Sequence, residues 1–143
     1  MTIWFASGNI NKKKELADIL TESFLFQYFD LKLPSDAGLN FNPDETGSSF
    51  LENALIKAEA LYRLFEENHS KKNSFSWQSG EPIISDDSGI CVDALDGRPG
   101  IHSSLYCGPG VPLGASGKLP DAERNALLLS ELGDTPLRSA RFV

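Results

Sequence analysis

The chain has 143 residues, enough for one domain with a single buried core. Hydrophobic residues make up 41% of it and charged residues 23%, a composition that excludes a mainly disordered, collagen-like or coiled-coil protein. The net charge of −7 would repel a long phosphate backbone, so no nucleic-acid-binding surface is predicted. A small anionic substrate is compatible with this charge where lysines concentrate at one point.

Membrane insertion and secretion are not indicated. No stretch approaches the roughly 20 apolar residues that a membrane span needs, and Met1–Phe5 lacks the features of a secretory signal. Cys91 and Cys107 are too few for a disulfide scaffold. The sequence therefore predicts no membrane partner and a cytoplasmic location.

The first part of the chain alternates strand and helix patterns. Ile3–Ala6 is a short run of β-forming residues, and a helical pattern follows from about Asn11 to Phe24. A second strand is predicted within Leu25–Leu33, and a loop covers Pro34–Gly47. This alternation indicates an α/β architecture.

The next helix has the clearest signal. Ser48 or Ser49 is its expected N-cap, and Ser49 and Glu52 have the spacing of a capping box. Its apolar stripe is Phe50, Ala54, Ala58, Leu61 and Phe65, backed by Leu51, Leu55 and Tyr62. Asn53 and Lys57 are four residues apart, so they share one helix face, which we expect to lie away from the stripe.

The second part of the chain contains shorter elements. The remaining predicted segments are a surface loop at 69–80, a buried strand at Pro82–Ser85, a short strand at Ile90–Val92, a loop at Gly108–Gly117 and a helix from Pro120 to Leu132. Arg138–Val143 has the pattern of a strand that has just begun, which predicts that the natural protein continues.

Ser7-Gly8-Asn9 is a polar turn that leads directly into a helix bearing Lys12, Lys13 and Lys14. Amide groups at a helix N-terminus and the helix dipole favour an anion. Lysines there cost about 0.3–1 kcal/mol each, a cost that an anionic ligand would offset. Solvated surface lysines are the alternative interpretation.

Two carboxylate segments are candidates for a metal site. Glu45 precedes the clearest helix, where its carboxylate could hold a metal or simply favour the helix N-terminus. Asp86 and Asp87 follow a strand and point to opposite faces in extended chain, so one of them is expected to enter a site. A hard oxygen ligand of this kind suits Mg²⁺. The alternative is an ordinary turn that ends the strand.

Together, these segments resemble the inosine triphosphate pyrophosphatase-like (Ham1-like) family over essentially the whole chain. The matching residues are Ala6-Ser7-Gly8-Asn9, Lys12 and Glu15-Leu16; Glu45-Thr46-Gly47, Phe50, Glu52-Asn53-Ala54 and Lys57-Ala58; and Asp86-Asp87-Ser88-Gly89-Ile90, Val92-Asp93-Ala94-Leu95, Gly97 and Pro99-Gly100. The resemblance implies an α/β fold with an elongated, curved, mixed β-sheet and flanking helices. One such domain would occupy residues 1–143 and lack its C-terminal part.

The resemblance also implies an activity. Such enzymes hydrolyse non-canonical purine nucleoside triphosphates (ITP, dITP and XTP) to the monophosphate and pyrophosphate with Mg²⁺, cleanse the nucleotide pool, and often form homodimers. Carried over to this chain, the phosphate-binding positions are Ser7, Gly8, Asn9 and Lys12, with Asn53 and Lys57 lining the triphosphate site and Ser88 contacting substrate. Glu45 and Asp87 match the Mg²⁺ positions, Asp87 also matches the general base, and Lys12 neutralises charge.

The match has two departures. Leu105 stands where the family has an arginine, and His102 stands at an aromatic position, to which we assign no chemistry. The later family motifs that recognise the base are absent from the sequence. An alternative function is therefore a catalytically inactive, shortened homologue that binds phosphates or a protein partner.

Overall fold

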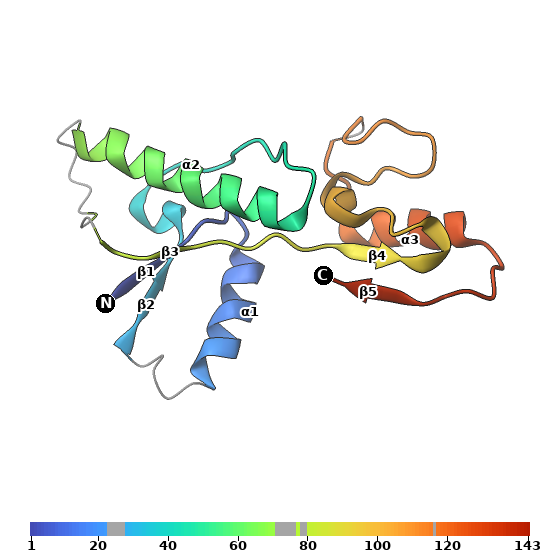
Figure 1. Ribbon diagram of the computed structural model, residues 1–143, viewed down its shortest axis with the longest axis horizontal. Coiled ribbons are helices and arrows are strands. Elements are labelled where there is room, and N and C mark those ends of the chain that lie inside the picture. The colour runs from blue at the N-terminus through green and yellow to red at the C-terminus, as the bar shows by residue number, and fades with distance from the viewer. Residues whose placement is uncertain (23–27, 71–76, 78–79, 116) are drawn as a thin grey trace. The chain divides into compact units, whose positions relative to one another are not determined.

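The computed structural model describes residues 1–22, 28–70, 77, 80–115 and 117–143 (Figure 1). The chain forms two compact units, Met1–Asp86 and Asp87–Val143. The first contains β1 (Thr2–Phe5), α1 (Ile10–Thr21), β2 (Asp30–Lys32), α2 (Phe50–Ser70) and β3 (Ile83–Ile84). The second contains β4 (Ile90–Val92), α3 (Asp121–Leu132) and β5 (Ala140–Phe142). None of the described helices is both long and apolar enough to cross a membrane.

The first unit is a parallel sheet with one helix on each face. Its strand order is β2-β1-β3, with β1 in the centre. Neighbouring side chains on a strand point to opposite faces. Trp4 accordingly packs into a cluster with Phe65 of α2, while Phe5 packs with Leu31 of β2 and against Leu16 of α1. The predicted α/β class is confirmed.

This topology gathers two of the sequence motifs at one edge of the sheet. The adjacent ends of β1 and β3 are joined by a hydrogen bond from the Ala6 amide to the Ile84 carbonyl, 2.8 Å long. Beyond these ends lie the Ser7–Asn9 turn and Asp86. In open α/β sheets, ligands bind outside the carboxyl ends of strands where the strand order reverses, and β1 is that point here.

The start of α2 agrees with its predicted cap. The Glu52 amide donates to Ser49 Oγ at 3.1 Å, and the Glu52 carboxylate accepts from both the hydroxyl and the amide of Ser48 at 2.6 Å. These hydrogen bonds, the Ser48 hydroxyl first, lower the pKa of Glu52. Ser49 is therefore the N-cap.

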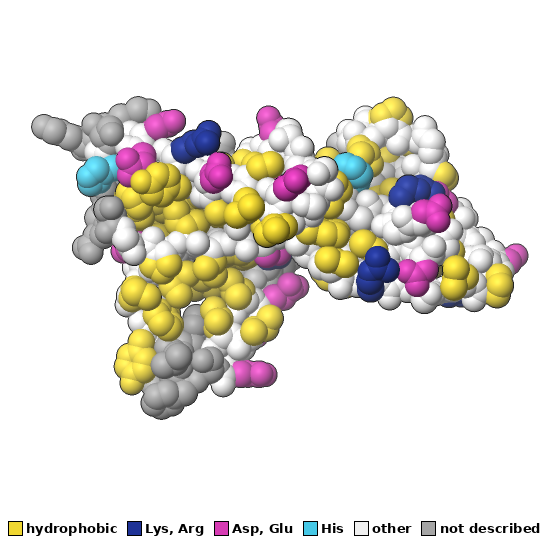
Figure 2. Space-filling model, viewed as in Figure 1, with side chains coloured by type: hydrophobic (Ala, Val, Ile, Leu, Met, Phe, Trp, Pro, Cys, Tyr) yellow, Lys and Arg dark blue, Asp and Glu magenta, His cyan; other side chains and the backbone are white. Residues whose placement is uncertain are grey.

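The prediction that Asn53 and Lys57 lie away from the apolar stripe is wrong. They continue the buried row of Leu61 and Phe65 at four-residue spacing, with exposures of 2%, 8%, 0% and 0% along the row. The predicted backing residues instead face outward: Leu51, Leu55 and Tyr62 are 70%, 53% and 50% exposed. Figure 2 shows hydrophobic side chains gathered along α2.

Two predicted segments differ from the structure. The predicted surface loop at 69–80 is wrong at its start, because α2 continues to Ser70, and at Trp77, which is buried against Phe65 with ring centroids 5.5 Å apart. Gly80, at the other end, is an exposed turn as predicted. The predicted buried strand near Ile84 is only half-buried. Residues 71–76 and 78–79, Phe24 and the start of the predicted second strand lie outside the described residues.

The second unit packs α3 against a two-stranded antiparallel ribbon. β4 pairs with β5, and Gly89 and Val143 extend the pairing by two hydrogen bonds of 3.0 and 3.1 Å. The core contains Val92 of β4 and Leu128 of α3. Tyr106 also lies there, and its burial, together with its hydrogen bond to Glu131, raises its pKa to about 12. The strand, helix and terminal-strand predictions in this part are confirmed.

Gly89 occupies a position without space for a side chain. A Cβ there would lie against the Gly100 carbonyl and 2.5 Å from Ser103 Oγ. That hydroxyl is itself held, since it accepts from the Ile90 amide and donates to the Gly100 carbonyl. We expect Gly89→Ala to lower the free energy of unfolding by about 1–3 kcal/mol through overpacking.

Urea unfolding followed by circular dichroism measures this loss. Asp96→Asn, an exposed left-handed position that asparagine tolerates, is the control and should be near-neutral. Equal stability of Gly89→Ala and the control would contradict the prediction.

Candidate functional site

The turn after β1 forms as predicted and orders its own backbone. Ser7 Oγ accepts from the Asn9 amide at 3.1 Å, and Asn9 caps α1 by accepting from the Asn11 amide at 2.9 Å. A Cβ on Gly8 would lie 3.3 Å from the Phe41 carbonyl oxygen. The backbone of the loop that precedes α2 thus approaches Gly8 closely.

Two lysines from different helices meet at Asp86. Lys12 Nζ of α1 lies 2.6 Å from Asp86 Oδ2. Lys57 Nζ of α2 donates to the Asp86 carbonyl oxygen at 3.1 Å and also lies 3.1 Å from Glu45 Oε1. The first unit therefore brings together Lys12, Lys57 and Glu45, three of the residues that the resemblance named, with Asp86 between the lysines.

Lys57 can be buried in line with the core residues of α2 because its ammonium group is paired. An ammonium removed from water is costly unless it is paired and hydrogen-bonded. Lys57 is 8% exposed, and the Glu45 carboxylate and the Asp86 carbonyl supply the required oxygens. With Lys12 and the Asp86 carboxylate, the cluster contains two positive and two negative charges, so an added anion meets no net repulsion from these four groups.

Asn53 holds the segment that carries Glu45. Its buried Oδ1 accepts from the Gly47 amide at 2.8 Å. A Cβ on Gly47 would lie 2.7 Å from that oxygen, so the contact requires glycine. Ser85 Oγ donates to the Ala54 carbonyl at 2.7 Å and ties the end of β3 to α2.

Lys13 does not share the site of Lys12. Its Nζ lies 2.6 Å from Asp36 Oδ2 in the 3₁₀ helix Pro34–Ala37, while Lys14 is exposed. The sequence left two interpretations of the lysines at the start of α1, an anionic ligand and solvation at the surface. For Lys12 and Lys13, carboxylates of the protein itself supply the compensating charge.

Asp36 provides a pH-dependent test of this packing. The hydrogen bond from Lys13, then that from the Leu33 amide, lowers its pKa from 3.8. A lowered folded-state pKa gives stability that is present above the unfolded value and is lost as pH falls through the folded value.

We expect Asp36→Asn to lose about 0.2–1 kcal/mol of unfolding free energy at pH 7, because the amide oxygen can still accept from the Leu33 amide and only the charge of an exposed, screened ion pair is lost. Denaturant titrations at a series of pH values check this. The difference between the two proteins should shrink as pH falls through the lowered folded-state pKa of Asp36, and a constant difference would contradict the assignment.

The other predicted site residues belong to the second unit. Asp87 and Ser88 are its first residues, directly after Asp86 in the chain. Leu105 ends the 3₁₀ helix Gly100–Leu105 and is 42% exposed. The roles given to Asp87 and Ser88, and the consequence of Leu105, stay predictions.

The donor chemistry around Lys57 fits Mg²⁺. Among the described residues, His, Cys, Asp and Glu side chains nowhere gather in a group of three that could hold a metal. Mg²⁺ needs fewer protein ligands, because one or two carboxylates plus substrate phosphates complete its coordination. The Glu45 carboxylate is a ligand of this kind, since its side chain is 38% exposed and supplies hard oxygen atoms beside the lysine cluster.

Asp86 is the site residue that sequence reasoning missed. Adjacent aspartates in extended chain predicted that only one would enter a site, and the resemblance selected Asp87. The order of strands in the sequence could have identified Asp86. Residues that follow neighbouring parallel strands lie at the same edge of the sheet, and Asp86 follows β3 as the Ser7–Asn9 turn follows β1.

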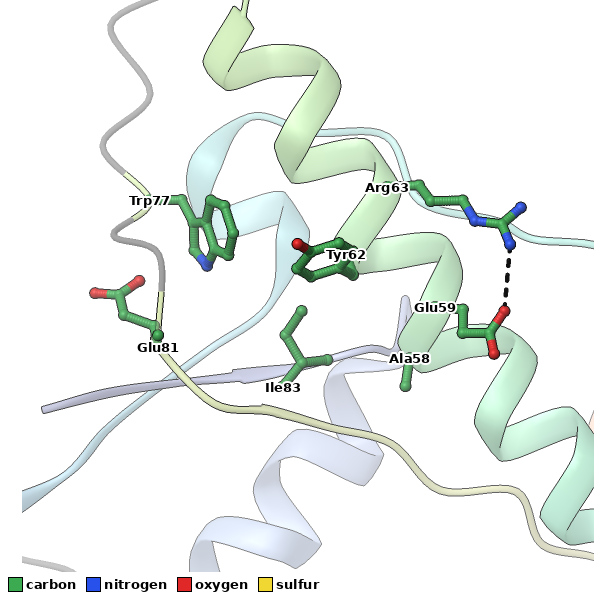
Figure 3. A pocket seen from close by; sticks show the side chains of 8 residues that line it. Ala58, Glu59, Tyr62, Arg63, Trp77, Glu81 and Ile83 are labelled. Atoms are coloured by element: carbon green, nitrogen blue, oxygen red, sulfur yellow. Dashed lines mark hydrogen bonds and ion pairs between the residues drawn. The ribbon is translucent and has the colours of Figure 1, made fainter.

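A separate pocket of about 640 Å³ lies between α2 and the chain leading into β3 (Figure 3). Tyr62 and Trp77 form an edge-to-face pair in it, with centroids 5.8 Å apart, beside the Glu59–Arg63 ion pair. The other lining residues are Ala58, Gly80, Glu81 and Ile83. The pocket contains none of the predicted site residues.

Comparison with known proteins agrees with these features. The sequence model of the Ham1 family matches residues 3–143. A dITP/XTP pyrophosphatase of Treponema denticola is 41% identical over 143 residues, covering 99% of this chain and 60% of the relative. One from Leptospira interrogans is 38% identical, covering 95% and 56%.

A solved structure of a Ham1 protein is also similar to this chain. The chain matches the Ham1 protein of Staphylococcus aureus with a TM-score of 0.67 and 31% identity, covering 99% of this chain and 59% of that one. The chain thus spans 60% and 56% of the lengths of these two curated relatives. On the match of residues 3–143, the chain belongs to the Ham1 family.

Proposed function

We propose that the protein hydrolyses nucleoside triphosphates to the monophosphate and pyrophosphate, with dITP, XTP and ITP as preferred substrates. The observation that carries this proposal is the convergence of Lys12 and Lys57 on Asp86 at the carboxyl edge of the parallel sheet, with Glu45 paired to Lys57. Family membership supports the same reaction, since two relatives are named dITP/XTP pyrophosphatases.

The lysines supply the charge that the leaving group needs. Attack on the α-phosphate transfers negative charge to the departing pyrophosphate, and cations fixed in place stabilise that charge without reorganisation. Lys57 is held by two oxygens and Lys12 by one carboxylate, so their ammonium groups are already oriented. In this proposal, Ser7, Gly8 and Asn9 contact the phosphates beside Lys12, and Asn53 positions the Glu45 segment.

The family resemblance assigns the rest of the proposed chemistry to Asp87 and Ser88, which follow Asp86 in the chain. Asp87 would orient the attacking water and accept its proton, and Ser88 would contact substrate. Glu45 and Asp87 would hold Mg²⁺ through carboxylate oxygens. When bound, the ion neutralises phosphate charge and lowers the pKa of its water.

Nucleotide hydrolysis with product analysis tests the proposal. The purified protein is incubated with dITP, XTP, ITP, ATP and GTP, with and without Mg²⁺, and pyrophosphate and monophosphate are quantified. We expect Mg²⁺-dependent pyrophosphate release that is faster from the first three nucleotides. Release of orthophosphate, or no turnover of any nucleotide, would contradict it. Phosphate binding without turnover would support the non-catalytic alternative.

The broader expectations remain proposals of the same kind. We propose a single domain over residues 1–143, a cytoplasmic location, a role in cleansing the nucleotide pool, and a homodimer. Size-exclusion chromatography with light scattering tests the dimer directly.

A further inference from the structure

Asp86 contacts both lysines of the site through different groups. Its carboxylate binds Lys12 at 2.6 Å, and its backbone carbonyl accepts from Lys57 at 3.1 Å. A substitution that removes only the carboxylate therefore leaves the Lys57 contact in place.

The carboxylate lies where an anion is favoured. Lys12 is in the first turn of α1, and that turn contains no acidic residue. The helix N-terminus attracts negative charge, and the ammonium adds to that attraction. The Asp86 carboxylate supplies this negative charge from another segment of the chain.

We propose that Asp86 is an internal counter-ion that competes with substrate phosphate for Lys12. In the ligand-free protein its carboxylate binds the ammonium that a phosphate oxygen binds in the complex, so substrate binding exchanges one ion pair for another. This inference rests on the proposed function, because it assigns Lys12 to the phosphates. It makes Asp86 a positioning residue that weakens phosphate binding while keeping Lys12 oriented.

The exchange is energetically accessible. The Lys12 and Asp86 side chains are 26% and 40% exposed, so water can solvate the carboxylate when it releases the lysine. Lys13 and Asp36 form a matched pair on the same helix, also 2.6 Å apart, with exposures of 23% and 38%. Only the Lys12 pair adjoins Lys57, so only its removal should affect phosphate binding.

Calorimetric titration with inorganic pyrophosphate in metal-free buffer tests the competition. The absence of metal separates this role from any part of Asp86 in holding Mg²⁺. We expect Asp86→Asn to lower the Kd for pyrophosphate about fivefold, since a competing negative charge is removed. Asp36→Asn should leave the Kd unchanged.

A double substitution tests whether the gain passes through Lys12. Lys12→Met should weaken pyrophosphate binding, and adding Asp86→Asn to it should restore little of the loss. Asp86→Ser replaces Asp86→Asn if circular dichroism shows that the latter does not fold.

The results of these titrations and of the hydrolysis assay distinguish failure of the proposed role of Asp86 from failure of the proposed function. An unchanged or higher Kd for the folded Asp86 variant overturns it, while Mg²⁺-dependent pyrophosphate release by the unsubstituted protein would leave the proposed function standing. Failure of the unsubstituted protein both to bind pyrophosphate and to hydrolyse nucleotides would overturn both.

Discussion

Lys57→Met is expected to lower kcat/KM for dITP by roughly 10²–10³-fold, the usual effect of removing one fixed donor to a developing charge. Methionine fills a similar volume without the ammonium, so the buried row of α2 stays packed. Glu45, whose side chain is 38% exposed, can be solvated once its partner is lost. The Asp86 carbonyl loses one donor, at a cost of about 1 kcal/mol.

Steady-state kinetics with dITP and Mg²⁺ measure the loss, and circular dichroism verifies the fold. Lys14→Met is the matched control, because Lys14 is an exposed lysine of α1 outside the cluster, and it should retain full activity. Activity of Lys57→Met within threefold of that control, on the order of 1 kcal/mol or less, would remove Lys57 from the mechanism.

Asp87→Asn is expected to lower kcat by about 10²–10⁴-fold while the protein stays folded. Asparagine keeps the shape of the side chain but cannot accept a proton from water. It is also a weaker ligand for a hard divalent ion. If Asp87 acts only on the water, kcat should fall with little change in KM.

Single-turnover and steady-state rates, measured across Mg²⁺ concentrations, separate these two roles. A loss recovered at high Mg²⁺ indicates a metal ligand, and a loss that persists at saturation indicates a base. Asp96→Asn, an exposed substitution of the same kind in the same unit, is the control. Turnover by Asp87→Asn equal to that of the control would exclude both roles.

Local structure could be predicted from the sequence, because it depends on residues that are close together in the chain. The polar turn after the first strand, the Ser49 cap of α2 and the stop of α3 at Gly133 depend on interactions within a few residues, which propensity and capping patterns describe. The α/β class followed from the alternation of strand and helix, which is also a short-range pattern.

The buried face of α2 could not be predicted in this way. Lysine is almost never buried unless it is paired, so its presence predicted a solvated face for Lys57 and Asn53. Lys57 is buried because Glu45 lies twelve positions before it and Asp86 lies twenty-nine after it. Trp77 was predicted to lie in a surface loop for a similar reason. Its neighbours in the sequence are polar, but its own ring packs on Phe65.

The sequence alone therefore determined the family, the secondary-structure order and the chemical types at the site, because these depend on residue identity and short spacing. The tertiary structure decided which carboxylate meets which lysine. Lys12 and Lys13 are neighbours with the same side chain, yet one pairs with Asp86 and the other with Asp36. An ion pair between distant segments forms only where folding brings its partners within a few ångströms, because the attraction is weak at longer range in water.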